Sequence, residues 1–368
     1  MSSAQLEIQL IAVVVAVACA LPGVFLVLRR MAMLSDAISH TVLLGIVLAF
    51  FVTQSLESPL LIFGAAAMGL ITVALVEMLH KTQLVRQDAA IGLVFPALFS
   101  LAVILISRFA SGVHLDVDAV LLGELAFAPF ERLTVLGLEL PRSLAVMVGI
   151  LLLNILFIGL FYKELKLATF DSNLAAALGF SPALIHYGLM GVVSVTAVGA
   201  FDAVGSVLVV ALMIAPAAAA YLLTDNLPRM LALAAGIGAA SAISGYWLAR
   251  ALDANIAGAM ATMTGLLFLL AFVFAPERGI VAIARRRQRQ KWAFAQAALA
   301  IHLLNHEGTA VAAVECSAAH LQDHLRWEAA FAAQVLERAQ KGQIISRENG
   351  LLRLTENGRS LAEQALVY

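Results

Sequence analysis

Residues 8–28 read IQLIAVVVAVACALPGVFLVL, an apolar run with Arg29 and Arg30 directly after it. A helix needs about 20 predominantly apolar residues to cross a hydrocarbon layer roughly 30 Å thick, and this run is long enough. Comparable runs recur along the chain as far as residue 275. A secretory signal would instead show one short run followed by a polar protein. We therefore predict an all-α polytopic membrane protein with eight or nine transmembrane helices.

The composition agrees with a membrane protein. Of 368 residues, 62% are hydrophobic and only 13% are charged, which lies far outside the usage of soluble globular domains. The two cysteines, Cys19 and Cys316, are too few and too far apart to indicate a disulfide framework or a zinc ribbon. Redox chemistry is therefore not expected.

Hydropathy and charge together predict the topology. The predicted membrane helices cover residues 8–28, 34–53, 59–79, 88–107, 143–162, 184–201, 203–223, 229–250 and 256–275. Twelve basic residues fall on one side, namely Arg29, Arg30, Lys81, Arg86, Lys163, Lys166, Arg229, Arg278, Arg285, Arg286, Arg287 and Arg289. Only Arg108, Arg132, Arg142 and Arg250 fall on the other. By the positive-inside rule we expect an external N-terminus and a cytoplasmic C-terminus.

One region does not fit this pattern. Within residues 109–141, the apolar stretch 117–130 is interrupted by Asp118 and Glu124 and is too short to span a bilayer. We expect it to be a re-entrant or extracellular segment, so the chain crosses the membrane eight or nine times.

The composition changes after residue 275. We predict a transmembrane domain over residues 1–282, a basic linker over 283–291 and a small α+β cytoplasmic domain over 292–368. Helices are expected at residues 292–305, near 317–325 and at 328–341. Asn349-Gly350 predicts a hairpin between residues 343–346 and 351–354, and a last helix follows Thr355.

The motif with the clearest chemistry is MLSDAISH, residues 33–40. Asp36 and His40 are four residues apart, so they share one face of the second membrane helix. A carboxylate oxygen with an imidazole nitrogen suits divalent ions such as manganese, iron and zinc. The alternative is that Ser35 or Asp36 caps the helix and His40 is a hydrogen-bond donor between helices. Because ionisable groups inside a membrane are by default functional, we favour the metal site.

Other chemistries have little support in the sequence. There is no GxxxxGK[ST] phosphate loop, so energy from ATP must come from another chain, and there is no HExxH or GxSxG motif. The chain is therefore not expected to be an enzyme or to hold a permanent cofactor. Four further ionisable residues are weaker site candidates, which we expect near helix ends: Glu77, His186, Asp202 and Asp253.

A long connector lies on the predicted cytoplasmic side. Residues 163–186 read KELKLATFDSNLAAALGFSPALIH and place Leu174, Ala177 and Leu178 on one face of an amphipathic helix. It could be an interfacial helix. If the chain is a transporter without its own ATPase motif, this connector is also the natural contact for a separate ATPase.

Several motifs resemble the metal-ion ABC permeases, the family of manganese, zinc and iron importers. They are MLSDAISHTVLLGIVLAF at 33–50, YKELKLATFD at 162–171, VGSVLVVALMIAPAAAAYLLT at 204–224 and FAPERG at 274–279. The resemblance covers roughly residues 8–282 and implies that Asp36 and His40 line the metal path. It further implies an ATPase subunit docked on residues 163–186, a second permease subunit and an extracytoplasmic metal-binding protein. At Asp202 the chain departs from the family, so no role is carried over.

The C-terminal segment resembles the winged-helix domain of metal-dependent repressors of the diphtheria-toxin-repressor type, notably in LTENGRSLA at 354–362. Its expected recognition helix, WEAAFAAQVLERAQK at 327–341, lacks the basic face that phosphate contacts need, so DNA is not expected as a partner. Four histidines lie in this segment as pairs four residues apart: His302 with His306, and His320 with His324. They could form a metal-sensing site, although solvated helix faces are the simpler interpretation.

Together these patterns predict the permease of an ATP-driven importer in a prokaryotic plasma membrane, carrying manganese first and zinc or iron next. Two alternatives stay open. One is a carrier driven by an ion gradient, and the other is a membrane-tethered, metal-responsive transcriptional regulator.

Overall fold

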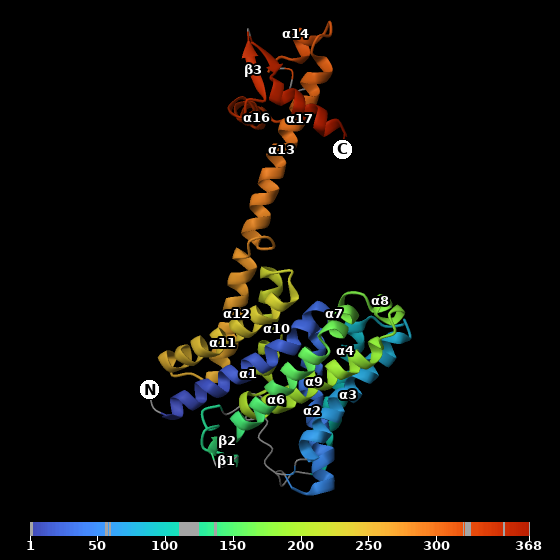
Figure 1. Cartoon of the computed structure of the whole chain (residues 1–368), viewed down its shortest axis with the longest axis vertical. Helices are drawn as coiled ribbons and strands as arrows, with labels where there is room; N and C mark the ends of the chain where they lie inside the picture. The colour runs from blue at the N-terminus through green and yellow to red at the C-terminus, as the bar shows by residue number, and fades with distance from the viewer. Residues whose placement is uncertain are drawn as a thin grey trace. The chain divides into compact units, whose positions relative to one another are not determined.

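The computed structural model describes most of the chain, which divides into two compact units, Met1–Gly279 and Ile280–Tyr368. Each unit is a continuous stretch of sequence, and in Figure 1 the colour runs from blue to yellow-orange through the first unit and from orange to red through the second. The structure describes all residues except 1–2, 56–57, 59, 110–124, 136–137, 319, 321–324, 349 and 368.

The first unit is a helical bundle. Within the described residues, nine of its helices are long and apolar enough to cross a membrane, which confirms the polytopic prediction. They are α1 (Ser3–Leu28), α2 (Ala32–Thr53), α3 (Leu60–Lys81), α4 (Gln87–Phe109), α6 (Arg142–Leu160), α9 (Pro182–Val204), α10 (Ser206–Leu223), α11 (Leu227–Leu252) and α12 (Ile256–Phe274).

Helix α1 lies at the centre of this bundle and contacts α6, α9, α10 and α11 (Figure 1). A close approach fixes one of these contacts, because a Cβ added at Gly23 would lie 1.9 Å from the Met213 carbonyl oxygen of α10. A buried amide fixes another. Asn154 of α6 donates to the Ala18 carbonyl oxygen at 2.8 Å and to Thr196 Oγ1 of α9 at 3.0 Å. Small residues and interhelical hydrogen bonds are the usual means of helix association in lipid, where there is no hydrophobic drive between apolar faces.

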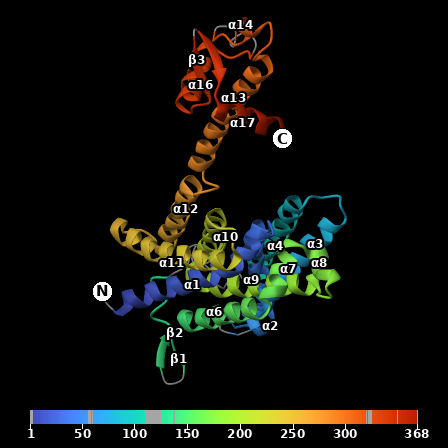
Figure 2. The same ribbon diagram turned by 45° about the horizontal axis from the view of Figure 1, so that its top comes forward.

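The connection before α6 contains an antiparallel ribbon that the sequence analysis did not predict. Strand β1 (Arg132–Val135) pairs with β2 (Leu138–Pro141), and Figure 2 shows the ribbon beyond the N-terminal end of α6. Arg132 Nη2 donates to both carboxylate oxygens of Glu7 at 3.1 Å, which ties the ribbon to α1. Of the expected re-entrant segment, Asp118 and Glu124 lie outside the described residues, whereas Leu125 and Ala128 are buried against the bundle core.

The second unit is a small α+β structure. It comprises α13 (Ile280–His306), α14 (Ala312–Glu315), α16 (Ala329–Lys341), β3 (Ile345–Glu348), β4 (Leu351–Leu354) and α17 (Glu356–Val367). Strands β3 and β4 form an antiparallel hairpin. The core is built from α13, α16 and the hairpin, with Leu299, Val335 and Ile345 among its buried side chains.

Helix α13 begins at Ile280 and not at Trp292 as expected, because the basic residues 283–291 continue the helix. Arginine, lysine and glutamine are good helix formers, so a charged segment need not be a loop. The expected helix near residues 317–325 falls largely outside the described residues, and so does His324.

Candidate functional site

The second membrane helix carries the motif that the sequence analysis singled out. Helix α2 begins at Ala32, and its N-cap residue Met31 makes no side-chain hydrogen bond to the first turn. Ser35 Oγ donates back to the Ala32 carbonyl oxygen at 2.8 Å, so it acts as a donor inside the helix and not as an N-cap acceptor. The alternative interpretation, that Ser35 or Asp36 caps this helix, is therefore wrong.

Asp36 and His40 do lie together on one face of α2. His40 Nε2 is 3.5 Å from Asp36 Oδ1, and the two side chains are 30% and 44% exposed, respectively. The imidazole packs against α4, where it stacks on Phe95 at 5.6 Å between ring centroids and meets the edge of Phe99 at 5.8 Å. The aromatic rings fix the position of the imidazole, while the carboxylate stays accessible.

A carboxylate and an imidazole at this separation can offer one oxygen and one nitrogen to the same divalent cation. Within the described residues, the structure brings no third His, Cys, Asp or Glu to this pair at metal-ligand distance. Two protein ligands leave the remaining coordination positions to water or to backbone oxygens. An ion held by only two protein ligands would be released more readily than one in a complete protein site.

The surroundings of α2 hold this pair in place. Thr41 directly follows His40 in the sequence. Its Oγ1 accepts a hydrogen bond from Thr72 Oγ1 of α3 at 2.8 Å. One turn further along, Gly45 and Gly64 let the backbones of α2 and α3 approach, since a Cβ added at Gly45 would lie 2.3 Å from the Gly64 carbonyl oxygen. The helix that carries the candidate site is therefore packed rigidly against α3.

Two of the weaker candidates, Glu77 and His186, form a cluster that the sequence alone did not reveal. His186 Nε2 lies 2.6 Å from Glu77 Oε1, and Tyr187 Oη donates to Glu77 Oε2 at 2.7 Å. Arg29 Nη1 lies 3.4 Å from His186 Nδ1. Because arginine only donates, Nδ1 must accept, and Nε2 of the neutral ring then carries the proton beside the carboxylate. The cluster joins the ends of α1, α3 and α9.

The same arginine reaches the connector after α6. This connector forms two short helices, α7 (Tyr162–Phe170) and α8 (Ser172–Ala177), in place of a single one. Arg29 Nε donates to Thr169 Oγ1 of α7 at 3.1 Å. Burial lowers the pKa of the Arg29 guanidinium, although an arginine starts so far above neutrality that it stays charged. Arg29 therefore links α7 to the Glu77 and His186 pair.

The break between α7 and α8 is made by Asp171, whose Oδ1 accepts from the Leu174 backbone N–H at 2.9 Å as an N-cap. The expected apolar face of this segment is exposed, with Leu174 at 46% and Leu178 at 60%. Exposed neighbours Phe170 and Phe180 extend it. This apolar surface at a helix end has the character of an interaction site.

Asp202 and Asp253 do not join either group. Asp202 lies exposed in the last turn of α9, and Asp253 is the C-terminal cap residue of α11 in the left-handed conformation. The other recognisable motif, at residues 274–279, packs on α10. Arg278 Nη1 donates to the Tyr221 carbonyl oxygen at 2.9 Å, lies over the Tyr221 ring and pairs with Asp225.

Comparisons with known proteins agree with this architecture. Residues 4–275 match the ABC 3 transport family. The zinc transport system membrane protein TroD of Treponema pallidum (strain Nichols) is 52% identical over 361 residues, which cover 98% of each chain, so the similarity includes the C-terminal unit. The manganese transport system membrane protein MntD of Bacillus subtilis (strain 168) is 52% identical over 270 residues, 73% of this chain and 91% of the relative.

Among solved structures, the chain is similar to one described as PsaBC from Streptococcus pneumoniae in complex with Fab. The TM-score is 0.63 and the identity 27%, over 75% of this chain and 94% of that chain. The similarity covers most of the solved chain.

Proposed function

Because the chain belongs to the ABC 3 transport family, we propose that it is the membrane-spanning subunit of an ATP-driven importer of divalent transition-metal ions. Relatives of similar identity are named as zinc and manganese transport proteins, so manganese and zinc are the cargoes to test first. The chain has no phosphate-loop motif, and a separate ATPase would supply the energy.

The observation that carries the proposal is the Asp36 and His40 pair on α2. Its two ligand atoms are 3.5 Å apart and partly exposed, inside a helix apolar enough to span a membrane. Ionisable side chains at such positions usually mark the path of an ion or substrate. We place the transported ion transiently between Asp36 and His40, with water completing its coordination.

We assign the ATPase contact to the apolar surface of α7 and α8. Leu174 and Leu178 would bury their exposed side chains against the partner, and Arg29 would pass the movement of α7 to the ends of α1, α3 and α9. The remaining partners of the proposed importer are a second permease subunit and an extracytoplasmic metal-binding protein.

We further propose that the second unit is a winged-helix domain in the cytoplasm. Its order of helices followed by the β3 and β4 hairpin and a last helix supports this fold. The excess of basic residues at the same predicted side of the membrane supports the location. The location is tested with a cysteine introduced at exposed Arg347 and an impermeant thiol reagent. A cytoplasmic domain should be labelled only after the cells are opened.

The function is tested by uptake of radioactive manganese and zinc in cells that express the complete transporter. Asp36→Asn and His40→Gln should each abolish uptake at matched membrane abundance, whereas exposed Asp253→Asn should not. Normal uptake by both site variants would remove the pair from the pathway.

A further inference from the structure

The C-terminal unit holds a group of metal-ligand side chains that the transport proposal does not use. One ligand atom from each of His302, His306 and Glu315 lies within 4.8 Å of the other two. His302 and His306 are one turn apart on α13, and Glu315 ends the short helix α14. We propose that these three side chains form a zinc site that is separate from the transport pathway.

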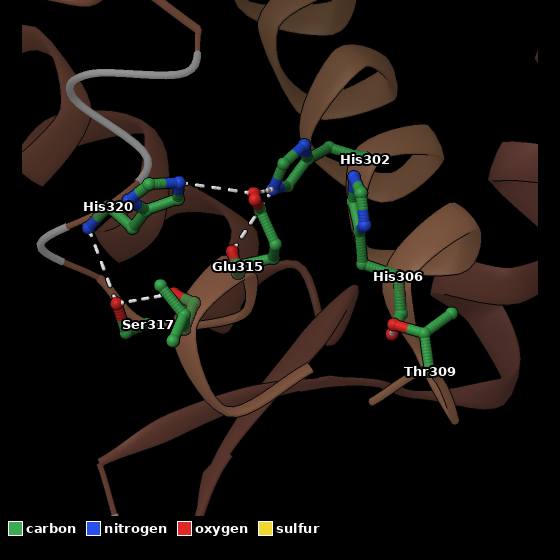
Figure 3. Close-up of polar contacts among 7 residues, drawn as sticks. His302, His306, Thr309, Glu315, Ser317 and His320 are labelled. Carbon is green, nitrogen blue, oxygen red and sulfur yellow. Dashed lines mark hydrogen bonds and ion pairs between the residues drawn. The ribbon is translucent and has the colours of Figure 1, made fainter. Parts of the chain in front are cut away.

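The geometry of the cluster is close to what a bound ion needs. Figure 3 shows the His302 ring between the Glu315 carboxylate and the His306 ring. The two imidazole centroids are 4.8 Å apart. Ligand atoms around a tetrahedral zinc, at about 2.1 Å from the ion, are about 3.4 Å from one another. The ligand atoms, which now lie within 4.8 Å of one another, would have to approach by up to about 1.4 Å around a tetrahedral zinc.

The cluster is also built into the core of the unit. His302 is buried, and its neighbours on the same face of α13, Leu299 and Leu303, belong to the hydrophobic core. The Glu315 side chain is only 17% exposed. Charged groups at the edge of a core are usually paired or bind cations, and the Glu315 carboxylate already lies 3.2 Å from His320 Nε2. A metal ion would neutralise the carboxylate in this position.

Supporting contacts of the kind that surround metal sites are already present. His302 Nε2 lies 3.0 Å from the Glu315 backbone carbonyl oxygen, which can only accept, so this nitrogen carries the proton. On the other side of the carboxylate, His320 Nε2 lies 3.2 Å from Glu315 Oε2 (Figure 3). Metal-binding histidines usually donate their second ring N–H to a carbonyl, and metal-binding carboxylates usually have a hydrogen-bonding neighbour. We therefore assign His320 as a positioning residue for Glu315.

The ligand types favour zinc. Two imidazole nitrogens and one carboxylate oxygen, with the fourth position left to water, form a common zinc donor set. A site rich in nitrogen binds zinc more tightly than manganese, in keeping with the general order of divalent-metal affinities. The site would thus bind zinc in preference to manganese, whichever ion is transported.

The test measures zinc on the full-length chain in detergent, in an Asp36→Asn, His40→Gln background that removes the proposed pathway pair. After dialysis against a chelator, zinc is titrated against a competing chromophoric chelator, and bound metal is counted by mass spectrometry. The background chain should bind one equivalent of zinc. His306→Gln and Glu315→Gln should each weaken binding by at least tenfold to a hundredfold, since even a supporting residue contributes that much. His320→Gln should weaken it less, and His80→Gln, an exposed histidine of the first unit, should not change it.

Folding of each variant is checked independently by alkylation of Cys316, which is 5% exposed beside Glu315. A variant whose Cys316 stays as slow to react as in the parent has a folded C-terminal unit. Undiminished zinc affinity in both His306→Gln and Glu315→Gln would overturn the proposal, and so would a background chain that binds no zinc. Either result would leave the transport proposal untouched, because that rests on Asp36 and His40.

Discussion

The contact between α2 and α3 gives a sharp prediction, because it positions the helix that carries Asp36 and His40. A Cβ added at Gly45 would lie 2.3 Å from the Gly64 carbonyl oxygen and 2.8 Å from the Ala65 Cα, both of them backbone atoms. Carbon and oxygen atoms normally approach no closer than about 3.3 Å. Gly45→Ala must therefore push the two helices apart by about 1 Å.

The expected cost follows from this displacement. Overpacking of a close-packed interior lowers the free energy of unfolding by about 1–3 kcal/mol, and the better helix propensity of alanine raises it by up to about 1 kcal/mol. We expect a net loss of about 1–2 kcal/mol of stability. Gly92→Ala on α4 is the matched control, because a Cβ there meets nothing within 4 Å. That variant should be as stable as the parent or slightly more stable.

The assay is thermal unfolding of the purified chain in detergent, with metal uptake measured in parallel. Gly45→Ala should unfold at a lower temperature than both the parent and Gly92→Ala, and its uptake should fall because the site on α2 shifts. If Gly45→Ala unfolds at the parent temperature, α2 and α3 are not in backbone contact at this position.

Three further predictions concern other contacts. Asn154→Leu removes the hydrogen bonds to Ala18 and Thr196. It should lower the free energy of unfolding by about 0.6–1.7 kcal/mol, the range typical of hydrogen bonds between membrane helices, and an unchanged unfolding temperature would contradict this. Arg29→Met should reduce the metal carried per ATP hydrolysed, because α7 loses its link to α9; unchanged coupling in reconstituted vesicles would refute that role. Leu174→Glu should leave the unfolding temperature unchanged, since the side chain is exposed, but should reduce co-purification of the ATPase; full retention would place the docking surface elsewhere.

Much of the first unit is predictable from sequence, because apolar run length is a direct requirement of the bilayer. The nine runs correspond to nine candidate spanning helices in the described residues, and α1 differs from its expected range mainly at its start. The spacing of Asp36 and His40 likewise implied a shared face. Neither inference depends on which helices pack together.

Features that depend on tertiary contact were not predictable. Glu77 and His186 are on α3 and α9, and no local pattern indicates that they meet or that Arg29 joins them. Within the connector at residues 163–186 we expected one short helix, and the structure has two, because the Asp171 side chain caps a new helix. In the C-terminal unit, the pairing of His302 with His306 was visible as a spacing. Their approach to Glu315 required the fold of the following loop.

The central claim is that this chain carries a divalent metal past Asp36 and His40. The most direct measurement is ATP-dependent transport of manganese and zinc into vesicles that contain the purified permease with its ATPase and metal-binding partner. Vesicles with the Asp36→Asn or His40→Gln permease should still hydrolyse ATP but accumulate neither metal, while vesicles with the parent accumulate at least one. Accumulation at the parent rate in both variants would contradict it.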